Sequence, residues 1–298
     1  MLTSAQIQKF EHNGFLNAGL AMEEAELAEL TSELQRILDT GPDGFIGDMP
    51  GPVLFRNVTG VGYEDSPDAL DEHKRAAVWQ IVNIWEASVA FKKLIFHPFI
   101  VEAISQLTGI ENLQVWHDQV QYKPADSGGA TSWHQDAPLW PSIEPMTPVS
   151  AWIPFDDAST SNGCMWMVPG SHQWGEHTEY LQTTWKHLEE FEQMTAVGTD
   201  FTPPADAPVQ EVHAVACPVK RGEVHFHHSM TWHGSPKNHS DGPRRALAIH
   251  YMTSDARYTG RDHVMQQFIE VAVGEPMLNA GPHFPVVRRD GETMTVDD

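Results

Sequence analysis

A histidine and an aspartate stand two residues apart in the stretch SWHQDAPLW, which runs from Ser132 to Trp140. In an extended strand, residues i and i+2 point to the same face, about 6 to 7 Å apart. His134 and Asp136 are therefore expected to project together from one strand and to reach a single divalent ion. Because a His-x-Asp pair is common by chance, a metal site needs a third ligand from elsewhere in the chain.

The third ligand is expected in the histidine-rich segment GEVHFHHSMTWHGS. His233 is the strongest candidate, because it ends a strand-like run just before Gly-Ser-Pro, where a strand stops and a side chain can be aimed inward. On the same segment, His225 and His227 would share one face and His228 the opposite face. These three are expected to be structural or to surround the ligands.

An arginine follows on the next predicted strand, RRALAIH. Alternation places Arg244, Ala246, Ala248 and His250 on one face of this strand. An arginine with two alanines beside it indicates an inward guanidinium with room left for a ligand. A buried arginine needs an anion, and its planar fork suits a carboxylate. Arg245 is the alternative if Arg244 faces solvent.

Two imidazoles and one carboxylate on one side of a metal, with open positions opposite, suit non-haem Fe(II) that works with O2. The arginine would then hold the far carboxylate of a chelating 2-oxo acid. Two alternatives remain open at this point: a cupin-like hydrolase or isomerase that uses zinc or manganese on the same three ligands, and a non-catalytic relative that only binds a ligand. A buried arginine has no obvious role in the first, and the intact set of residues argues against the second.

The order His-x-Asp, a long interval, then WHGSxxNxSxxxR resembles the phytanoyl-CoA dioxygenase family of Fe(II)- and 2-oxoglutarate-dependent oxygenases. The stretches WHQDAPLW, MVPGSH and HGSPKNHS occur in the order typical of that family, and the similarity runs from about 115 to 252. The resemblance implies a double-stranded β-helix core. It also implies an oxidoreductase of the dioxygenase class, with Fe(II), 2-oxoglutarate and O2 as cofactor and cosubstrates.

By this resemblance, His134, Asp136 and His233 would bind the iron. Arg244 would bind the 5-carboxylate of 2-oxoglutarate, with Ser235 as its hydroxyl neighbour. The resemblance thus gives the three candidate ligands and Arg244 roles in one site.

The same resemblance implies further contacts with the cosubstrate. Trp152 would line the 2-oxoglutarate site, and Gln121 or Lys123 would meet its 1-carboxylate or keto end, with Gln121 ranked higher. Both could equally be ordinary residues of a strand surface. Trp140, which follows the ligand strand at the mouth of the barrel, is expected to approach the substrate pocket.

The implied reaction hydroxylates a small-molecule substrate and releases succinate and CO2. Related halogenases replace the ligand carboxylate with a small residue, so the presence of Asp136 favours hydroxylation over chlorination. Desaturation, ring closure and epoxidation share the same metal site and stay open. The lack of a basic cluster argues against a CoA thioester, whereas several tryptophans near the mouth would suit an apolar body or a quaternary ammonium.

The elements that must position these residues change in character near residue 113. After it, short alternating segments bounded by turn residues replace helical patterns, which predicts a mainly β fold with a jelly-roll, cupin-like core at about 113–255. We expect a helical N-terminal part at about 1–112 and a C-terminal extension at 256–298. Together they would form one domain, 1–298.

Helical patterns and turn residues mark the other elements. A capping box at Thr3-Ser4-Ala5-Gln6 starts the chain, and the Gly/Pro-rich stretch TGPDGFIGDMPGPV is predicted to be a loop. An insertion at 176–196 has helical composition and is expected to cover the barrel mouth. The other predicted helices lie at 22–38, 68–92 and 97–107.

Charge and cysteine content limit the partners and the compartment. Acidic residues number 41 and basic residues 18, for a formal charge of -23. This balance argues against nucleic-acid binding, which needs clustered Lys and Arg. No apolar run is long enough for a transmembrane helix, and no signal peptide is evident. With only Cys164 and Cys217 there is no disulfide framework, so we expect a cytoplasmic enzyme, monomeric or homodimeric.

Overall fold

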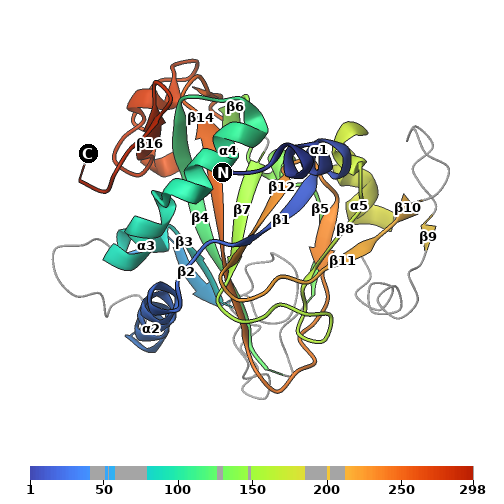
Figure 1. Cartoon of the computed structure of the whole chain (residues 1–298). Coiled ribbons are helices and arrows are strands. Elements are labelled where there is room, and N and C mark those ends of the chain that lie inside the picture. The colour runs from blue at the N-terminus through green and yellow to red at the C-terminus, as the bar shows by residue number, and fades with distance from the viewer. Residues whose placement is uncertain are drawn as a thin grey trace.

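The computed structural model describes residues 1–40, 51–52, 54–57, 79–125, 130–146, 149–184, 200–201 and 212–297. Two antiparallel sheets form its centre, and helices flank them on more than one side (Figure 1). The predicted Gly/Pro-rich loop lies almost wholly outside the described residues. Within the described ranges, no helix is both long enough and apolar enough to cross a membrane.

The large sheet has nine strands in the order β1-β12-β7-β14-β4-β16-β17, with β3 on β4 and β2 on β3. Its centre is β14, which pairs with β4 from Arg244↔Lys123 to Thr253↔Leu113 and with β7 on its other side. The bounds are β1 (Phe15–Leu20), β2 (Leu54–Asn57), β3 (Trp79–Val82), β4 (Leu113–Lys123), β7 (Val149–Pro154), β12 (Glu223–His228), β14 (Arg244–Thr253), β16 (Val286–Arg289) and β17 (Glu292–Thr293).

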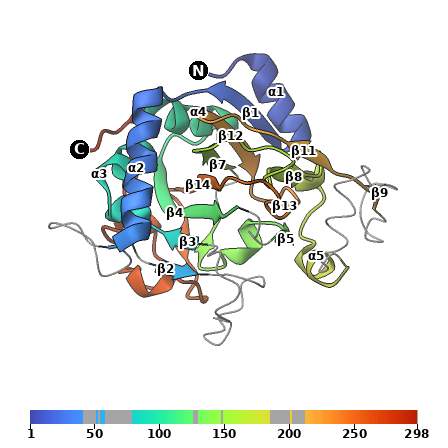
Figure 2. The ribbon, with the colours of Figure 1, turned by 90° about the horizontal axis from the view of Figure 1, so that it is seen from below.

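The small sheet has four strands in the order β11-β8-β13-β5. Seen from below, its strands lie beside β4, β7, β12 and β14 of the large sheet (Figure 2). Two further pairs, β9 with β10 and β6 with β15, stand apart from both sheets. The bounds are β5 (Thr131–His134), β8 (Met165–Met167), β11 (Val215–Cys217), β13 (His233–Ser235), β6 (Ile143–Glu144), β15 (Arg257–Tyr258), β9 (Asp200–Phe201) and β10 (Val212–His213).

Capping residues mark both ends of the first helix. The predicted capping box at the N-terminus is present, since Thr3 and Gln6 cap each other's backbone groups. Gly14 ends the first helix with φ of 81°, a left-handed conformation that glycine adopts without strain. The α-helices are α1 (Ser4–Asn13), α2 (Glu24–Thr40), α3 (Val89–Ile95), α4 (Pro98–Thr108) and α5 (Thr178–Thr184). Short 3₁₀ turns are η2 (Ile84–Glu86), η3 (Ala137–Leu139), η4 (Ser171–Gln173), η5 (Gln266–Phe268) and η6 (Met277–Asn279).

The prediction of helix at 68–92 is wrong at Trp79–Val82 and correct from Val89 onward. Trp79–Val82 forms the strand β3, which pairs with β4 through Gln80↔Gln121, and only Val89 onward is α-helical. The segment WQIV is rich in residues that pack well on a sheet, and pairing with a long neighbouring strand overrides the helical spacing. Phe15–Leu20 also forms a strand, β1, so short strands interrupt the N-terminal part, whose described residues are otherwise mainly helical.

Alternation along β14 separates the two sides of the large sheet. Leu247, Ile249 and Tyr251 pack into the main core beneath the helices. Ala246 and Ala248 belong to a second cluster on the opposite face, which faces the small sheet. This is the two-faced pattern predicted for RRALAIH, and it leaves small side chains on the face where a ligand has to fit.

Candidate active site

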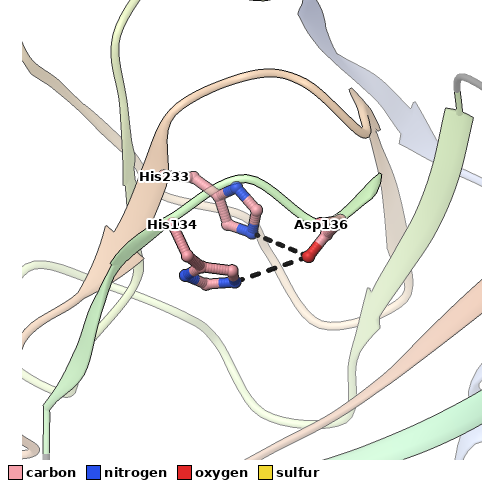
Figure 3. A group of neighbouring side chains, drawn as sticks. All are labelled: His134, Asp136 and His233. Carbon is pink, nitrogen blue, oxygen red and sulfur yellow. Dashed lines mark ion pairs between the residues drawn. The ribbon is translucent and has the colours of Figure 1, made fainter. Parts of the chain in front are cut away.

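Two histidines meet across the small sheet. His134 ends β5 and His233 begins β13, and the two are direct cross-strand partners with ring centroids 4.1 Å apart. Asp136 Oδ1 lies 3.4 Å from Nε2 of His134 and 3.6 Å from Nε2 of His233 (Figure 3). One ligand atom from each residue lies within 4.8 Å of the others. The three residues predicted from spacing as ligands therefore come together.

The route by which Asp136 reaches this group differs from the prediction. The strand β5 ends at His134, and Asp136 has helical dihedrals, φ -73° and ψ -48°, at the start of η3. Its backbone N–H donates to the carbonyl of Ser229, 2.8 Å away, which bends the chain out of the sheet. The expectation that both ligands project from one strand is wrong, because a turn and not strand alternation brings the carboxylate to the imidazole.

Backbone carbonyls fix both histidine rings. Nδ1 of His134 lies 2.7 Å from the carbonyl of Ser132, and Nδ1 of His233 lies 2.9 Å from the carbonyl of Thr231. A carbonyl only accepts, so each Nδ1 carries a proton and each Nε2 faces Asp136. Burial would lower the pKa of His134, but the hydrogen bond to Asp136 raises it above its usual value. Metal-binding histidines usually donate their other ring N–H in this way. The donor set therefore fits a divalent ion.

His227 supports the carboxylate from the large sheet. Its Nε2 lies 3.0 Å from Oδ2 of Asp136, and its ring is buried. Burial by itself would raise the pKa of Asp136, but His233, His134 and His227 together hold that pKa well below its usual range. Burial and the neighbouring His134 lower the pKa of His233 to about 3. An ionised carboxylate thus sits beside a neutral imidazole, the states that a metal ion requires.

Arg244 is buried in the same region. Its guanidinium lies 5.5 Å from the ring of Trp152, and Nη1 donates to the carbonyl of Gln121 at 3.3 Å, while Nε has no hydrogen-bond partner. In the described ranges, no carboxylate lies within ion-pair distance of it. Burial lowers its pKa to about 10, so it is charged at neutral pH. Arg245, on the other face, forms a two-pronged pair with Asp156 at 2.6 and 2.8 Å.

A cavity of about 400 Å³ opens beside these groups. Gln121, Trp152 and Ser235 line it together with the three candidate ligands. Nε1 of Trp152 donates to Oε1 of Gln121 at 3.0 Å, which fixes both side chains in the wall. Gln182 of α5 also lines the cavity, as expected for an insertion over the mouth; the rest of the predicted helix, from 185 onward, lies outside the described residues.

Lys123 is placed differently from Gln121. It is buried, and its Nζ donates to the carbonyls of Ser235 and Pro236 at 3.2 and 2.7 Å, outside the described lining of the cavity. Burial and the nearby Arg244 lower its pKa well below the usual range. The structure thus brings Gln121 to the cavity and directs Lys123 to the turn that follows His233.

The far end of the cavity holds residues that sequence reasoning missed. Trp140 lines it, as predicted, and so does His250, which alternation placed on the face of Arg244; His117 and His263 also line it and were not singled out. His117 could have been found, because LQVWHDQVQYK places it on the same strand face as Gln121. His263 could not, because it enters from the C-terminal segment, whose sequence carries no regular pattern.

Comparisons with known proteins agree with this geometry. The family model of phytanoyl-CoA dioxygenase (PhyH) matches residues 10–246. The peroxisomal phytanoyl-CoA dioxygenase of Rattus norvegicus is 26% identical over 282 residues, which cover 91% of this chain and 76% of the rat protein.

Solved structures resemble the chain over nearly its full length. SnoK, a non-haem α-ketoglutarate-dependent carbocyclase from nogalamycin biosynthesis, has a TM-score of 0.70 at 21% identity and covers 96% of each chain. The epimerase SnoN, in complex with Fe3+, α-ketoglutarate and nogalamycin RO, has a TM-score of 0.66 at 21% identity, covering 95% of this chain and 98% of SnoN. These likenesses confirm the mainly β, jelly-roll fold class predicted from the sequence.

Proposed function

The chain belongs to the phytanoyl-CoA dioxygenase family of 2-oxoglutarate-dependent non-haem iron dioxygenases, and from this premise we propose that it hydroxylates a small molecule with release of succinate and CO2. The observation that supports the proposal most is the convergence of two imidazoles and one carboxylate in the lining of one cavity, with the buried Arg244 behind Trp152 and Gln121 of its wall. A facial set of this kind with open positions suits Fe(II) and O2.

The iron would be held by His134, Asp136 and His233. Both rings already present Nε2 in the required tautomer, and Oδ2 of Asp136 is engaged by His227, which leaves Oδ1 to the ion. Little rearrangement of the side chains is then needed for binding, since their neighbours already orient them.

The 2-oxoglutarate would lie between the metal and Arg244. Arg244 is buried and has no carboxylate partner in the part of the chain that the structure describes, which makes the guanidinium a strong site for the 5-carboxylate. Ser235 would stand beside this carboxylate, Trp152 would form the wall, and Gln121 would meet the 1-carboxylate or keto end. Lys123 would act more remotely, by holding the carbonyls of the turn that carries Ser235.

When bound, iron and 2-oxoglutarate supply the oxidising chemistry, in which O2 is consumed and the 2-oxo acid becomes succinate and CO2. The chain's own residues orient the reactants. Arg244 fixes the far end of the cosubstrate, and His227 keeps Asp136 from turning. The buried setting of these groups strengthens each charge interaction, because little water is present to screen it.

The alternative of a metal-dependent hydrolase or isomerase, and that of a non-catalytic relative, gain no support from the comparisons. A zinc hydrolase would have no use for a buried guanidinium at the cavity wall that has no carboxylate partner among the described residues. Product analysis separates hydroxylation from the other oxidative outcomes: a gain of one oxygen atom supports the proposal, and loss of two hydrogens would point to desaturation or ring closure.

The test uses the protein under anaerobic conditions. Fe(II) and 2-oxoglutarate together should give the weak visible absorption of the chelate, at one equivalent per chain. Asp136→Ala should abolish it, and Arg244→Ala should raise the 2-oxoglutarate concentration needed for half-saturation by about 10-fold or more, the effect of losing charged hydrogen bonds.

Arg245→Ala is the matched control, because this neighbouring guanidinium pairs with Asp156 on the opposite face. Its 2-oxoglutarate requirement should stay that of the wild type. Absent chelate absorption in the wild-type protein would refute the function, and equal behaviour of the two arginine variants would refute the role of Arg244.

A further inference from the structure

The cavity has two chemically different ends. On β4, Gln121 and His117 both line it and are four residues apart, about 13 Å along an extended strand. On β14, His250 pairs with His117, whereas Arg244 lies six residues away near Gln121. A five-carbon diacid held by Arg244 and the metal ligands cannot also reach the end where His117 and His250 lie. That end is left for another molecule.

Three imidazoles and an indole build this second end. The rings of His117 and His250 are 4.8 Å apart and those of His117 and His263 are 5.5 Å apart. Trp140 packs against two of these rings: its ring centroid lies 4.4 Å from that of His250 and 5.6 Å from that of His117. The four residues come from β14, β4, the C-terminal segment and the turn after the metal ligands, so they form one wall from four separate parts of the chain.

Backbone contacts define which ring nitrogens can donate. Nδ1 of His117 faces the carbonyl of Asp118 at 3.3 Å and must carry the proton, so its Nε2 is an acceptor. That Nε2 is buried and has no hydrogen-bond partner. Nδ1 of His263 instead accepts the N–H of Met265 at 3.2 Å, so its Nε2 is a donor. The wall therefore offers both an acceptor and a donor to a ligand.

The three imidazoles are uncharged at neutral pH. Burial is the main cause, and it lowers the pKa of His250 and of His263 to about 4 each. Burial, with the neighbouring His250 and His263, lowers the pKa of His117 well below its usual range. A neutral imidazole recognises hydroxyl groups by hydrogen bonding and gives no ionic partner to a phosphate or carboxylate.

The remaining lining agrees with a neutral ligand. Among the lining residues that the structure describes, Asp136 is the only Asp, Glu, Lys or Arg. Gln80 and Gln119 add neutral polar groups, whereas Leu139 and Val264 add apolar surface next to Trp140. At about 400 Å³ the cavity is also near the lower end of the roughly 300–1,000 Å³ range of small-molecule pockets. No lysine or arginine among these described lining residues would pair with the phosphates of a CoA thioester.

We propose that His117, His250, His263 and Trp140 form the subsite of the prime substrate, and that this substrate is an uncharged compact molecule with hydroxyl groups beside an apolar ring face. Each hydroxyl can donate to Nε2 of His117 and accept from Nε2 of His263, while the apolar face packs on Trp140. The inference rests on the proposed function, because that function leaves this end of the cavity to the substrate.

The first test measures binding of three probes that share one ring: trans-1,2-cyclohexanediol, cyclohexanecarboxylate and cyclohexylammonium. The protein is loaded with Zn(II) and 2-oxoglutarate so that no turnover occurs, and saturation-transfer NMR reports contact with each probe. The diol should give the strongest signal. An equal or stronger signal from either charged probe, or no signal from the diol, would overturn the proposal.

Variants assign the signal to the subsite. His117→Phe and His263→Phe should each weaken binding of the diol by roughly 2- to 10-fold, the effect of one neutral hydrogen bond. His117→Gln keeps an acceptor and serves if the Phe variant does not fold. It should lose less affinity for the diol than Trp140→Leu, which removes the indole face of the subsite. The control is His97→Phe, at the start of α4 and outside the cavity lining. Unchanged diol binding in both His117 and His263 variants would overturn the proposal.

A second readout needs no ligand. Nitrogen-15 NMR of the histidine side chains at pH 7 should show His117 protonated at Nδ1 and His263 protonated at Nε2, both neutral; a charged ring at either position would overturn the inference. The anaerobic absorption of wild-type protein with Fe(II) and 2-oxoglutarate tests the proposed function separately. A normal chelate without diol binding refutes only the subsite, whereas a missing chelate refutes the function.

Discussion

Removing the hydrogen bond from His227 to Asp136 should weaken metal binding without removing a metal ligand. His227→Phe keeps a planar ring in the buried position and deletes the donor at Nε2, which lies 3.0 Å from Oδ2. Asp136 is only 6% exposed, so water cannot easily replace that donor. The carboxylate would be left free to turn, and its orientation toward the two histidines would no longer be fixed.

The size of the effect follows from the kind of bond. A hydrogen bond to a charged group contributes about 1.5–3 kcal/mol, which corresponds to roughly 10- to 100-fold in a dissociation constant. Partners of metal ligands typically show the same range, about 10- to 100-fold, when they are mutated. We therefore expect metal affinity to fall by one to two orders of magnitude, with the ligand set intact.

The assay is titration of metal-free protein with Co(II), whose visible spectrum also reports the number of ligands. His228→Phe is the matched control. His228 is the next residue on β12, it lies on the opposite face from His227, and its ring centroid is 5.1 Å from that of His172. His227→Phe should lose affinity and keep the spectral shape, whereas His228→Phe should match the wild type. Equal affinity in the two folded variants would refute the argument, and complete loss of binding would show that His227 is itself a ligand.

Three further predictions concern stability and the cosubstrate site. Burial lowers the pKa of His228 to about 4, and Nδ1 of the neutral ring accepts the N–H of Met230. The contribution of this ring to the free energy of unfolding is therefore complete above pH 6.5. Up to roughly 3 kcal/mol of that free energy is lost as the pH falls from 6.5 to about 4, because the unfolded chain takes up the proton first. Chemical unfolding of His228→Asn should show a correspondingly smaller loss over that interval. Ala248→Leu, which adds bulk to the lining beside Trp152, should weaken 2-oxoglutarate binding in the chelate titration and leave metal affinity unchanged. Phe155→Ala should lower the free energy of unfolding by about 3–5 kcal/mol, because Phe155 is fully buried; a loss below 1 kcal/mol would contradict its place in the core.

Local alternation carried most of what could be predicted about the site. In RRALAIH it separates Arg244 from Arg245, and the two have the expected contrast: Arg244 is buried with no carboxylate near it among the described residues, and Arg245 is paired with Asp156. The end of a strand before Gly-Ser-Pro likewise marks His233. These inferences needed only the two-residue period of a strand and the need of a buried charge for a partner.

Contacts between distant segments account for what was missed. The turn at Asp136 depends on the carbonyl of Ser229, almost a hundred residues away, so the sequence around the aspartate alone suggests an extended strand. Trp79–Val82 becomes a strand because β4 is there to pair with it. His263 reaches the cavity from a segment without periodicity. Each depends on tertiary placement, which local pattern does not encode.

The cross-strand pairing of His134 with His233 links metal binding to the folding of the small sheet. β5 has four residues and β13 has three, and the register of their pairing shifts between His233 and Ser235. A slip of one residue would turn one imidazole to the other face of the sheet. An ion bound by both rings would therefore cross-link the two strands. Backbone hydrogen exchange in β5 and β13 should then slow on metal binding, and it should slow more than exchange in the long pairing of β4 with β14.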